Sequence, residues 1–281
     1  MKRMFILKLV ICLLLVNFSA TAQKNKKQRG DSLTVYREFF SLGQWYLNVP
    51  LQMKVHFINK TMPAITGQDS IEADMILYYG KKDFYIQAKG MEQIANDTIL
   101  VLVNNEAKMI NLYPNNGQLL EYMEKMLSSP IADSSLEKLA RQYTGRMEDE
   151  SKSMKRIELQ SRDKIFGTDL SRETIKITYQ ANTHQPVMYS RSKLSLLPVD
   201  SVVYSMMADD SHYTGRMVST KKNEGNLFFI VKEQITRCQF SQVTHDQQTP
   251  PVREQDRIVK TTNGGYEPAE GFKDYLVMKE F

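Results

Sequence analysis

Apolar and polar residues alternate along the stretch from Leu51 to Tyr113, and this period of two constrains the fold more than any other feature of the chain. Successive side chains of a β-strand point to opposite faces, so the alternation predicts strands with one buried face. Turn-forming residues separate the runs, and strands joined by short connections usually pair with their neighbours in sequence. We therefore expect an antiparallel meander of about five strands: Leu51–Phe57, Ile71–Tyr79, Phe84–Ala88, Thr98–Val103 and Ala107–Tyr113.

The first 22 residues have the pattern of a secretory signal peptide. A basic start precedes the apolar run Leu9–Val16, and small residues stand at Ala20 and Ala22. An uncleaved membrane anchor is the alternative, but this run is shorter than the roughly 20 apolar residues of a spanning helix. We expect cleavage after Ala22, export to the periplasm, and a possible association with the outer membrane.

The mature chain has a modest charge and a single cysteine. Loss of the leader removes three basic residues and lowers the formal net charge from +5 to about +2. No basic stripe remains, so nucleic acid is not an expected partner. Cys238 is left without an internal partner, and we expect it to be a small buried apolar side chain. The polar, basic segment 23–30 is expected to be disordered.

Residues 31–281 are expected to form one domain, because no linker divides them. Helices are predicted from Asp31, with an aromatic face, and then over Gln118–Leu127 and Leu136–Tyr143. The second half returns to strand-like runs, which include Asp200–Met207 and the final strand Asp274–Phe281. The polar segment at about 245–263 contains two prolines and is interpreted as an exposed loop.

No motif for catalysis or metal binding stands out in the sequence. The four histidines are far apart and lie in no zinc motif. Asp209-Asp210-Ser211-His212 contains the residue types of a hydrolase, but consecutive positions point apart, and a hydrophilic turn is the favoured interpretation. We therefore expect a protein that is not an enzyme and needs no cofactor or metal.

The order of predicted elements resembles the LolA/LolB-like periplasmic lipoprotein carrier superfamily. The matching segments are the helix with Tyr36, Phe39 and Phe40, the strands of the meander, the turn Asn96-Asp97 before an apolar strand, and the two later helices. The sequence departs from the family at Asn48-Val49-Pro50-Leu51-Gln52, which has the proline but not the arginine of the family's early strand. The resemblance implies a mainly β fold with a few helices (α+β), in which helices cover a strongly curved antiparallel sheet, or incomplete β-barrel.

The resemblance also implies a carrier function in the cell envelope and in outer membrane biogenesis. Such a protein binds lipid or lipoprotein acyl chains on an apolar concave face and makes at most transient contact with a membrane. Flexible methionine side chains suit variable ligands, although the same side chains would equally suit a filled core. The candidate lining residues are Tyr36, Phe39, Phe40, Met53, Val55, Phe57, Met75, Leu77, Tyr79, Phe84, Ile86 and Met123.

Two other functions follow from the same pattern. An envelope assembly or scaffold protein would bind a protein partner through open strand edges or through 245–263. An outer-membrane β-barrel is suggested by the C-terminal Phe281 and the alternation that precedes it, but two predicted helices interrupt the strand series.

Overall fold

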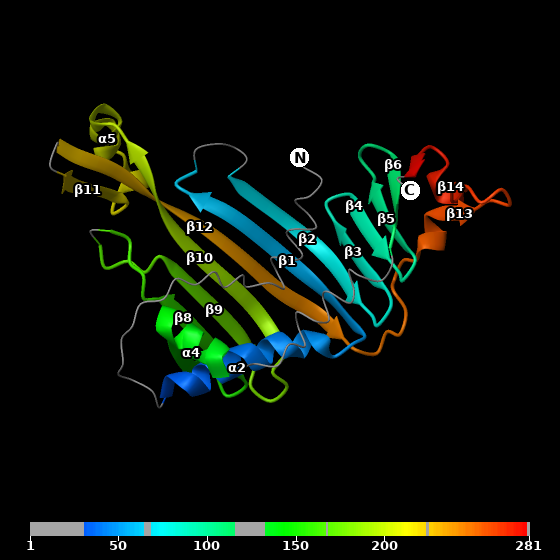
Figure 1. The fold of residues 1–281 in the computed structure, drawn as a ribbon, viewed down its shortest axis with the longest axis horizontal. Helices are drawn as coiled ribbons and strands as arrows, with labels where there is room; N and C mark the ends of the chain where they lie inside the picture. The colour runs from blue at the N-terminus through cyan, green and yellow to red at the C-terminus, as the bar shows by residue number, and fades with distance from the viewer. Residues whose placement is uncertain (1–30, 65–68, 116–132, 167, 223–224, 280–281) are drawn as a thin grey trace. The chain divides into compact units, whose positions relative to one another are not determined.

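The computed structural model describes residues 31–64, 69–115, 133–166, 168–222 and 225–279. The predicted leader, the segment 23–30 and the helix Gln118–Leu127 lie outside these residues. Figure 1 shows the ribbon, which divides into two compact units. Among the described residues, unit 1 comprises 31–43, 58–64, 69–72, 133–166, 168–222 and 225–238, and unit 2 comprises 44–57, 73–115 and 239–279. The single domain expected over 31–281 stays a prediction.

The predicted meander is confirmed in unit 2, where all five expected strands are present and a sixth joins them. Strands β2 to β6 pair antiparallel, each with the next in sequence (Figure 1). The strands are β1 (Leu51–Met62), β2 (Ser70–Tyr79), β3 (Phe84–Ala88), β4 (Met91–Ala95), β5 (Ile99–Asn104) and β6 (Met109–Pro114). β1 and β2 also have residues in unit 1.

Strand β4 is the strand that the sequence analysis missed. Lys89 and Gly90 form the two-residue turn between β3 and β4, and both have positive φ angles, of 44° and 71°. Such a turn suits the right-handed twist of a hairpin, but lysine is an unusual residue for its first position. Glu92 and Gln93 are polar, so the sequence of β4 lacks the apolar alternation of a strand, although both side chains are buried.

The C-terminal segment packs on one face of this meander. Its elements are η3 (Glu254–Asp256), β13 (Ile258–Lys260), β14 (Tyr266–Pro268), η4 (Glu270–Phe272) and β15 (Leu276–Lys279). β13 and β14 form a separate two-stranded sheet, and β15 pairs parallel with β6, which makes the main sheet mixed. The final strand predicted near the C-terminus is thus present.

The segment 245–263, which was expected to be an exposed loop, contains η3 and β13. Ile258 is buried in the core of unit 2. Arg257 donates hydrogen bonds from Nε and Nη2 to Glu92 Oε2, at 3.0 and 2.8 Å. Since Glu92 is 5% exposed, this ion pair compensates a carboxylate that burial would otherwise destabilise.

Unit 1 contains a second antiparallel series with the strand order β12-β10-β9-β8-β7, and β11 pairs with β12. Neither unit's strand order closes on itself. The predicted fold class, mainly β with a few helices and an incomplete barrel-type sheet, is confirmed. The remaining elements are α2 (Asp31–Gln44), η1 (Trp45–Leu47), α4 (Asp133–Gln142), β7 (Tyr143–Asp149), β8 (Met154–Ser161), β9 (Glu173–Gln180), β10 (Pro186–Val199), α5 (Ser201–Ala208), η2 (Ser211–Tyr213), β11 (Met217–Lys222) and β12 (Gly225–Thr244).

The strand predicted over Asp200–Met207 is wrong, because this segment forms helix α5. Asp200 Oδ1 accepts a hydrogen bond of 2.8 Å from the backbone N–H of Val203, which is an N-cap. This capping bond satisfies a free backbone donor in the first turn, and the β-propensity of the valines does not outweigh it.

Helices α2 and α4 pack beside each other on β7–β9 and form the core of unit 1 (Figure 1). Their buried faces present apolar residues that are three or four positions apart. The buried members of this cluster are Val35, Tyr36, Phe39, Leu42, Leu136, Leu139, Tyr143, Ile157, Leu159, Ile175 and Tyr179. The predicted helices at these two places are therefore confirmed.

Gly145 on β7 allows α2 to approach the sheet closely. A Cβ atom there would lie 3.0 Å from side-chain carbons of Tyr36 and Val35 and 3.1 Å from Leu159 Cδ2. These distances are below ordinary carbon–carbon contact, so any side chain must displace the helix or the core.

We predict that Gly145→Val destabilises the protein by about 1–3 kcal/mol, because it overpacks the contact between α2 and β7. Gly43→Ala is the matched control. Nothing lies within 4 Å of a Cβ at Gly43, and alanine favours the helix by up to about 1 kcal/mol. Urea unfolding followed by circular dichroism measures both changes. Equal stabilities for Gly145→Val and the wild type would contradict the close packing.

Candidate functional site

Eight of the predicted lining residues lie on β1–β3 in unit 2, and they share one face. Met75, Leu77 and Tyr79 of β2 pair with Ala88, Ile86 and Phe84 of β3, so these residues project to the same side. His56 Nδ1 on β1 bonds Asp74 Oδ1 on β2 at 2.8 Å, which places the even positions of both strands on the other side. The odd positions of β1 therefore join the first face; the predicted residues among them are Met53, Val55 and Phe57. We call this side of β1–β6 the Met75 face.

The opposite side, which we call the Tyr78 face, is covered by the C-terminal segment. Its buried residues are Tyr78, Tyr85, Ile94, Ile99, Val101, Val103, Ile110 and Leu112, which pack with Ile258. Val252, Tyr266, Phe272, Tyr275 and Val277 are partly buried against them. Strands β3 and β4 are thus buried on both faces, an arrangement in which both sides of the sheet need a cover.

The Met75 face becomes more open toward β5 and β6. Leu102 lies between Gln93 of β4 and Asn111 of β6, and the register places all three on this face. Leu100 and Leu102 are half-buried, whereas Val101 and Val103, on the other side of the same strand, are fully buried. The β5–β6 part of the Met75 face therefore carries apolar surface that solvent still reaches.

The other predicted lining residues are not placed with this set. Tyr36 and Phe39 are buried and Phe40 is half-buried, and all three belong to the core of unit 1. Tyr36 Oη donates a 2.7 Å hydrogen bond to the carbonyl of Tyr143. These contacts give the three aromatic residues a structural role in unit 1. Met123 lies outside the described residues. The eleven predicted lining residues that the structure describes are buried or half-buried, and their role as a ligand lining stays a prediction.

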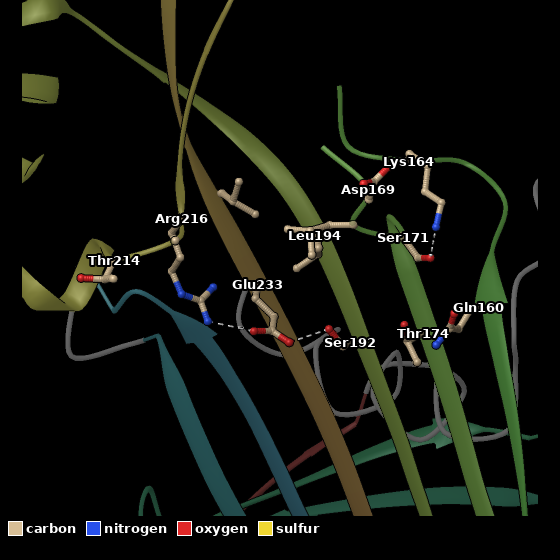
Figure 2. Close-up of a pocket in the computed structure, with 13 residues that line it drawn as sticks. Gln160, Lys164, Asp169, Ser171, Thr174, Ser192, Leu194, Thr214, Arg216 and Glu233 are labelled. Carbon is tan, nitrogen blue, oxygen red and sulfur yellow. Dashed lines mark hydrogen bonds and ion pairs between the residues drawn. The ribbon is translucent and has the colours of Figure 1, made fainter. Parts of the chain in front are cut away.

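A polar pocket of about 530 Å³ lies in unit 1, and the sequence analysis did not predict it (Figure 2). Gln160 pairs with Thr174, and Thr174 pairs with Ser192, so the three side chains form a row across β8, β9 and β10. Ser192 Oγ donates a 2.7 Å hydrogen bond to Glu233 on β12. These four residues lie on four different strands, so no local sequence pattern predicts that their side chains meet.

Arg216 and Glu233 form an ion pair at the rim of this pocket. Arg216 Nη2 donates to Glu233 Oε2 at 3.0 Å, and Nη1 donates to the carbonyl of Met62 at 3.3 Å. Lys164 Nζ donates to Ser171 Oγ at 2.9 Å (Figure 2). Burial acts to raise the pKa of Glu233, but the hydrogen bonds from Ser192 and Arg216 outweigh it and hold that pKa below its ordinary value.

The other side chains that could act in catalysis or metal binding do not cluster into a site among the described residues. The four histidines have separate partners: Asp74, Glu38, Asp210 and the carbonyl of Pro50. No group of three or more metal-binding side chains is present in the described part of the chain. None of the described helices has the length and apolarity to cross a membrane.

The structure bears on the predictions for Cys238 and for the segment 209–212. Cys238 is fully buried, and this burial raises the pKa of its thiol to about 12, so it is a buried apolar side chain as predicted. His212 is exposed, and Asp210 Oδ1 accepts from its backbone N–H at 2.9 Å. This bond caps η2, which agrees with the interpretation of 209–212 as a hydrophilic turn.

No protein-family model matches the sequence, and no curated protein matches it. The structure is similar to the LolA superfamily protein NE2245 from Nitrosomonas europaea, with 8% identity, coverage of 78% of this chain and 94% of that chain, and a TM-score of 0.26. It is also similar to a domain assigned to outer membrane lipoprotein-sorting proteins from Vibrio parahaemolyticus, with 8% identity, the same coverages and a TM-score of 0.24. Likenesses with TM-scores this low give no basis for a function.

We predict that Glu233→Gln lowers the free energy of unfolding by about 1–2 kcal/mol at pH 7, because charged hydrogen bonds from Arg216 and Ser192 are weakened. The folded pKa of Glu233 is depressed, so the stabilisation is present above the unfolded pKa and is lost as pH falls through the folded value. Urea unfolding at pH 7 and pH 3 should therefore show a difference between variant and wild type that shrinks in acid.

The exposed pocket residue Asp169 provides the control for this experiment. Asp169→Asn should change stability by less than about 0.5 kcal/mol at either pH. A Glu233→Gln variant that matches the wild type at pH 7 would show that the Arg216–Glu233 contact adds no stability.

Proposed function

We propose that the protein binds the acyl chains of a lipid or lipoprotein on the Met75 face of unit 2 and acts as a non-catalytic carrier in the cell envelope. The observation that carries this proposal is the contrast between the two sides of β5. Val101 and Val103 are closed off under the C-terminal segment, whereas Leu100 and Leu102 keep apolar surface that solvent reaches. Apolar surface of this kind gains about 25 cal/mol per Å² when an acyl chain covers it.

The composition of the Met75 face supports an acyl ligand over a rigid planar one. Met53 and Met75 are unbranched and flexible, so they adapt to chains of different length. Phe84, Ile86 and Leu77 are buried beside them and make this face apolar. No charged side chain is among the predicted lining residues, which fits a hydrocarbon ligand better than a polar metabolite. Binding would then be a partition of the chain from water and would require no reaction.

An envelope location is part of this proposal. It is supported by the signal-peptide pattern of residues 1–22, for which we propose cleavage after Ala22. N-terminal sequencing of the protein from an osmotic-shock fraction tests this location. An intact leader on a protein that stays with the cytoplasm would contradict it.

We predict that the mature chain binds cis-parinaric acid, a fluorescent fatty acid, and that Leu102→Glu weakens this binding about ten-fold or more. A buried carboxylate beside the acyl chain would be desolvated without a partner, and half-buried Leu102 can accept the change without collapse of the core. Fluorescence titration gives the affinities, and thermal unfolding checks that the variant is folded.

Leu227→Glu is the matched control, because Leu227 is 43% exposed and lies in unit 1. It should bind the probe as the wild type does. Equal loss of binding in both variants, or no binding by the wild type, would contradict the Met75 face as the acyl site. Native mass spectrometry of gently purified protein adds an independent readout, since the proposal expects co-purified lipid.

A further inference from the structure

Two amide side chains on the Met75 face are buried and incompletely hydrogen-bonded. Gln93 on β4 is 5% exposed and Asn111 on β6 is 6% exposed. Gln93 Nε2 and Asn111 Oδ1 have no hydrogen-bond partner among the residues that the structure describes. One atom is a donor and the other is an acceptor. A buried polar atom without a partner destabilises the fold, so a ligand that reaches and pairs with these atoms would gain the full value of each hydrogen bond.

The strand register fixes how these two amides are spaced. Gln93 pairs with Leu102 on β5, and Leu102 pairs with Asn111, so the three positions form one row across adjacent strands. Neighbouring strands lie about 4.8 Å apart, which puts the two amide positions about 9.6 Å apart along the row. Side-chain amides form hydrogen-bonded ladders with one amide per strand spacing. Gln93 and Asn111 thus provide the two outer amides of such a ladder. The middle amide is missing, because the side chain between them is the hydrocarbon chain of Leu102.

A secondary amide has the groups that this gap requires. Its carbonyl oxygen can accept from Gln93 Nε2, and its N–H can donate to Asn111 Oδ1 on the opposite side. An ester of the same shape can accept but cannot donate, so it would leave Asn111 Oδ1 unpaired. An acyl chain attached to such an amide would extend over the apolar residues of the same face, which include Ile86 and Leu77.

We infer that the Met75 face selects acyl chains linked through a secondary amide, and that Gln93 and Asn111 bind this amide as a three-membered ladder. The inference rests on the proposed acyl-binding function and names the chemical class of its ligand. An N-acylated amine lipid and an N-acylated protein terminus share this chemistry. Ester-linked chains bind the same apolar surface without completing the ladder.

The test compares two probes that differ at one atom. N-palmitoylethanolamine has an amide N–H where 2-hydroxyethyl palmitate has an ester oxygen, and displacement of cis-parinaric acid gives both affinities. The mature wild-type protein should bind the amide about ten-fold or more tightly than the ester, because a buried polar group that loses its partner discriminates strongly. An N-palmitoylated hexapeptide is the third ligand, and its affinity relative to N-palmitoylethanolamine distinguishes a protein terminus from a free lipid as the source.

The double variant Gln93→Met/Asn111→Leu removes both amides with little change in volume. It should bind the ester at least as well as the wild type and lose the preference for the amide, so retained ester binding also shows that it is folded. Gln87→Met is the control, because Gln87 is a half-buried amide that pairs with Glu92 and so belongs to the Tyr78 face. It should keep the preference.

The outcomes separate this inference from the proposed function. Equal affinities of the wild type for the amide and the ester would overturn the inference and leave acyl binding intact. A preference that survives in the double variant would also overturn it. Binding of neither probe would overturn the proposed function, and the inference with it.

Discussion

The alternation of side chains across the two faces of the β2–β6 meander is the constraint on which the rest of the account depends. Because each strand pairs in register with the next, the odd and even positions of every strand become two continuous surfaces. The Tyr78 face is closed by the C-terminal segment, and the Arg257–Glu92 ion pair fastens this segment to β4. The Met75 face carries the second apolar surface, and both the proposed function and the ligand chemistry follow from it.

The two units use their aromatic and polar residues for different purposes. In unit 1, Tyr36 and Phe39 pack on β7–β9 and hold α2 in place, with Gly145 providing the space. In the polar pocket of the same unit, Glu233 accepts hydrogen bonds from Arg216 and Ser192. In unit 2, polar atoms of Gln93 and Asn111 are buried without partners on the same face as half-buried Leu102. This combination on one face is the reason that we place the ligand on unit 2.

The sequence predicts the fold well where local patterns decide the structure. Strong alternation specifies five of the six strands of the meander, and a 3.6-residue period specifies α2 and α4. Strand β4 was missed because Lys89 is an unusual turn residue and because Glu92 depends on the distant Arg257. The valines of helix α5 favour a strand in the sequence pattern, whereas the N-cap hydrogen bond from the Val203 N–H to Asp200 favours the helix that the structure contains. The row from Gln160 to Glu233 depends on the pairing of distant strands, which the sequence does not display. Gln93 and Asn111 were visible as polar residues in apolar strands, but only the register shows that they share a face.

Methyl NMR with a spin-labelled fatty acid tests the central claim most directly. A stearate that carries a doxyl group on its chain broadens the signals of methyl groups close to it. We expect stronger broadening for the methyls of Leu77, Ile86 and Leu102 on the Met75 face than for those of Val101, Val103 and Ile110 on the Tyr78 face. Broadening of the Tyr78 face instead, or of both faces equally, would contradict an acyl site on one side of the sheet.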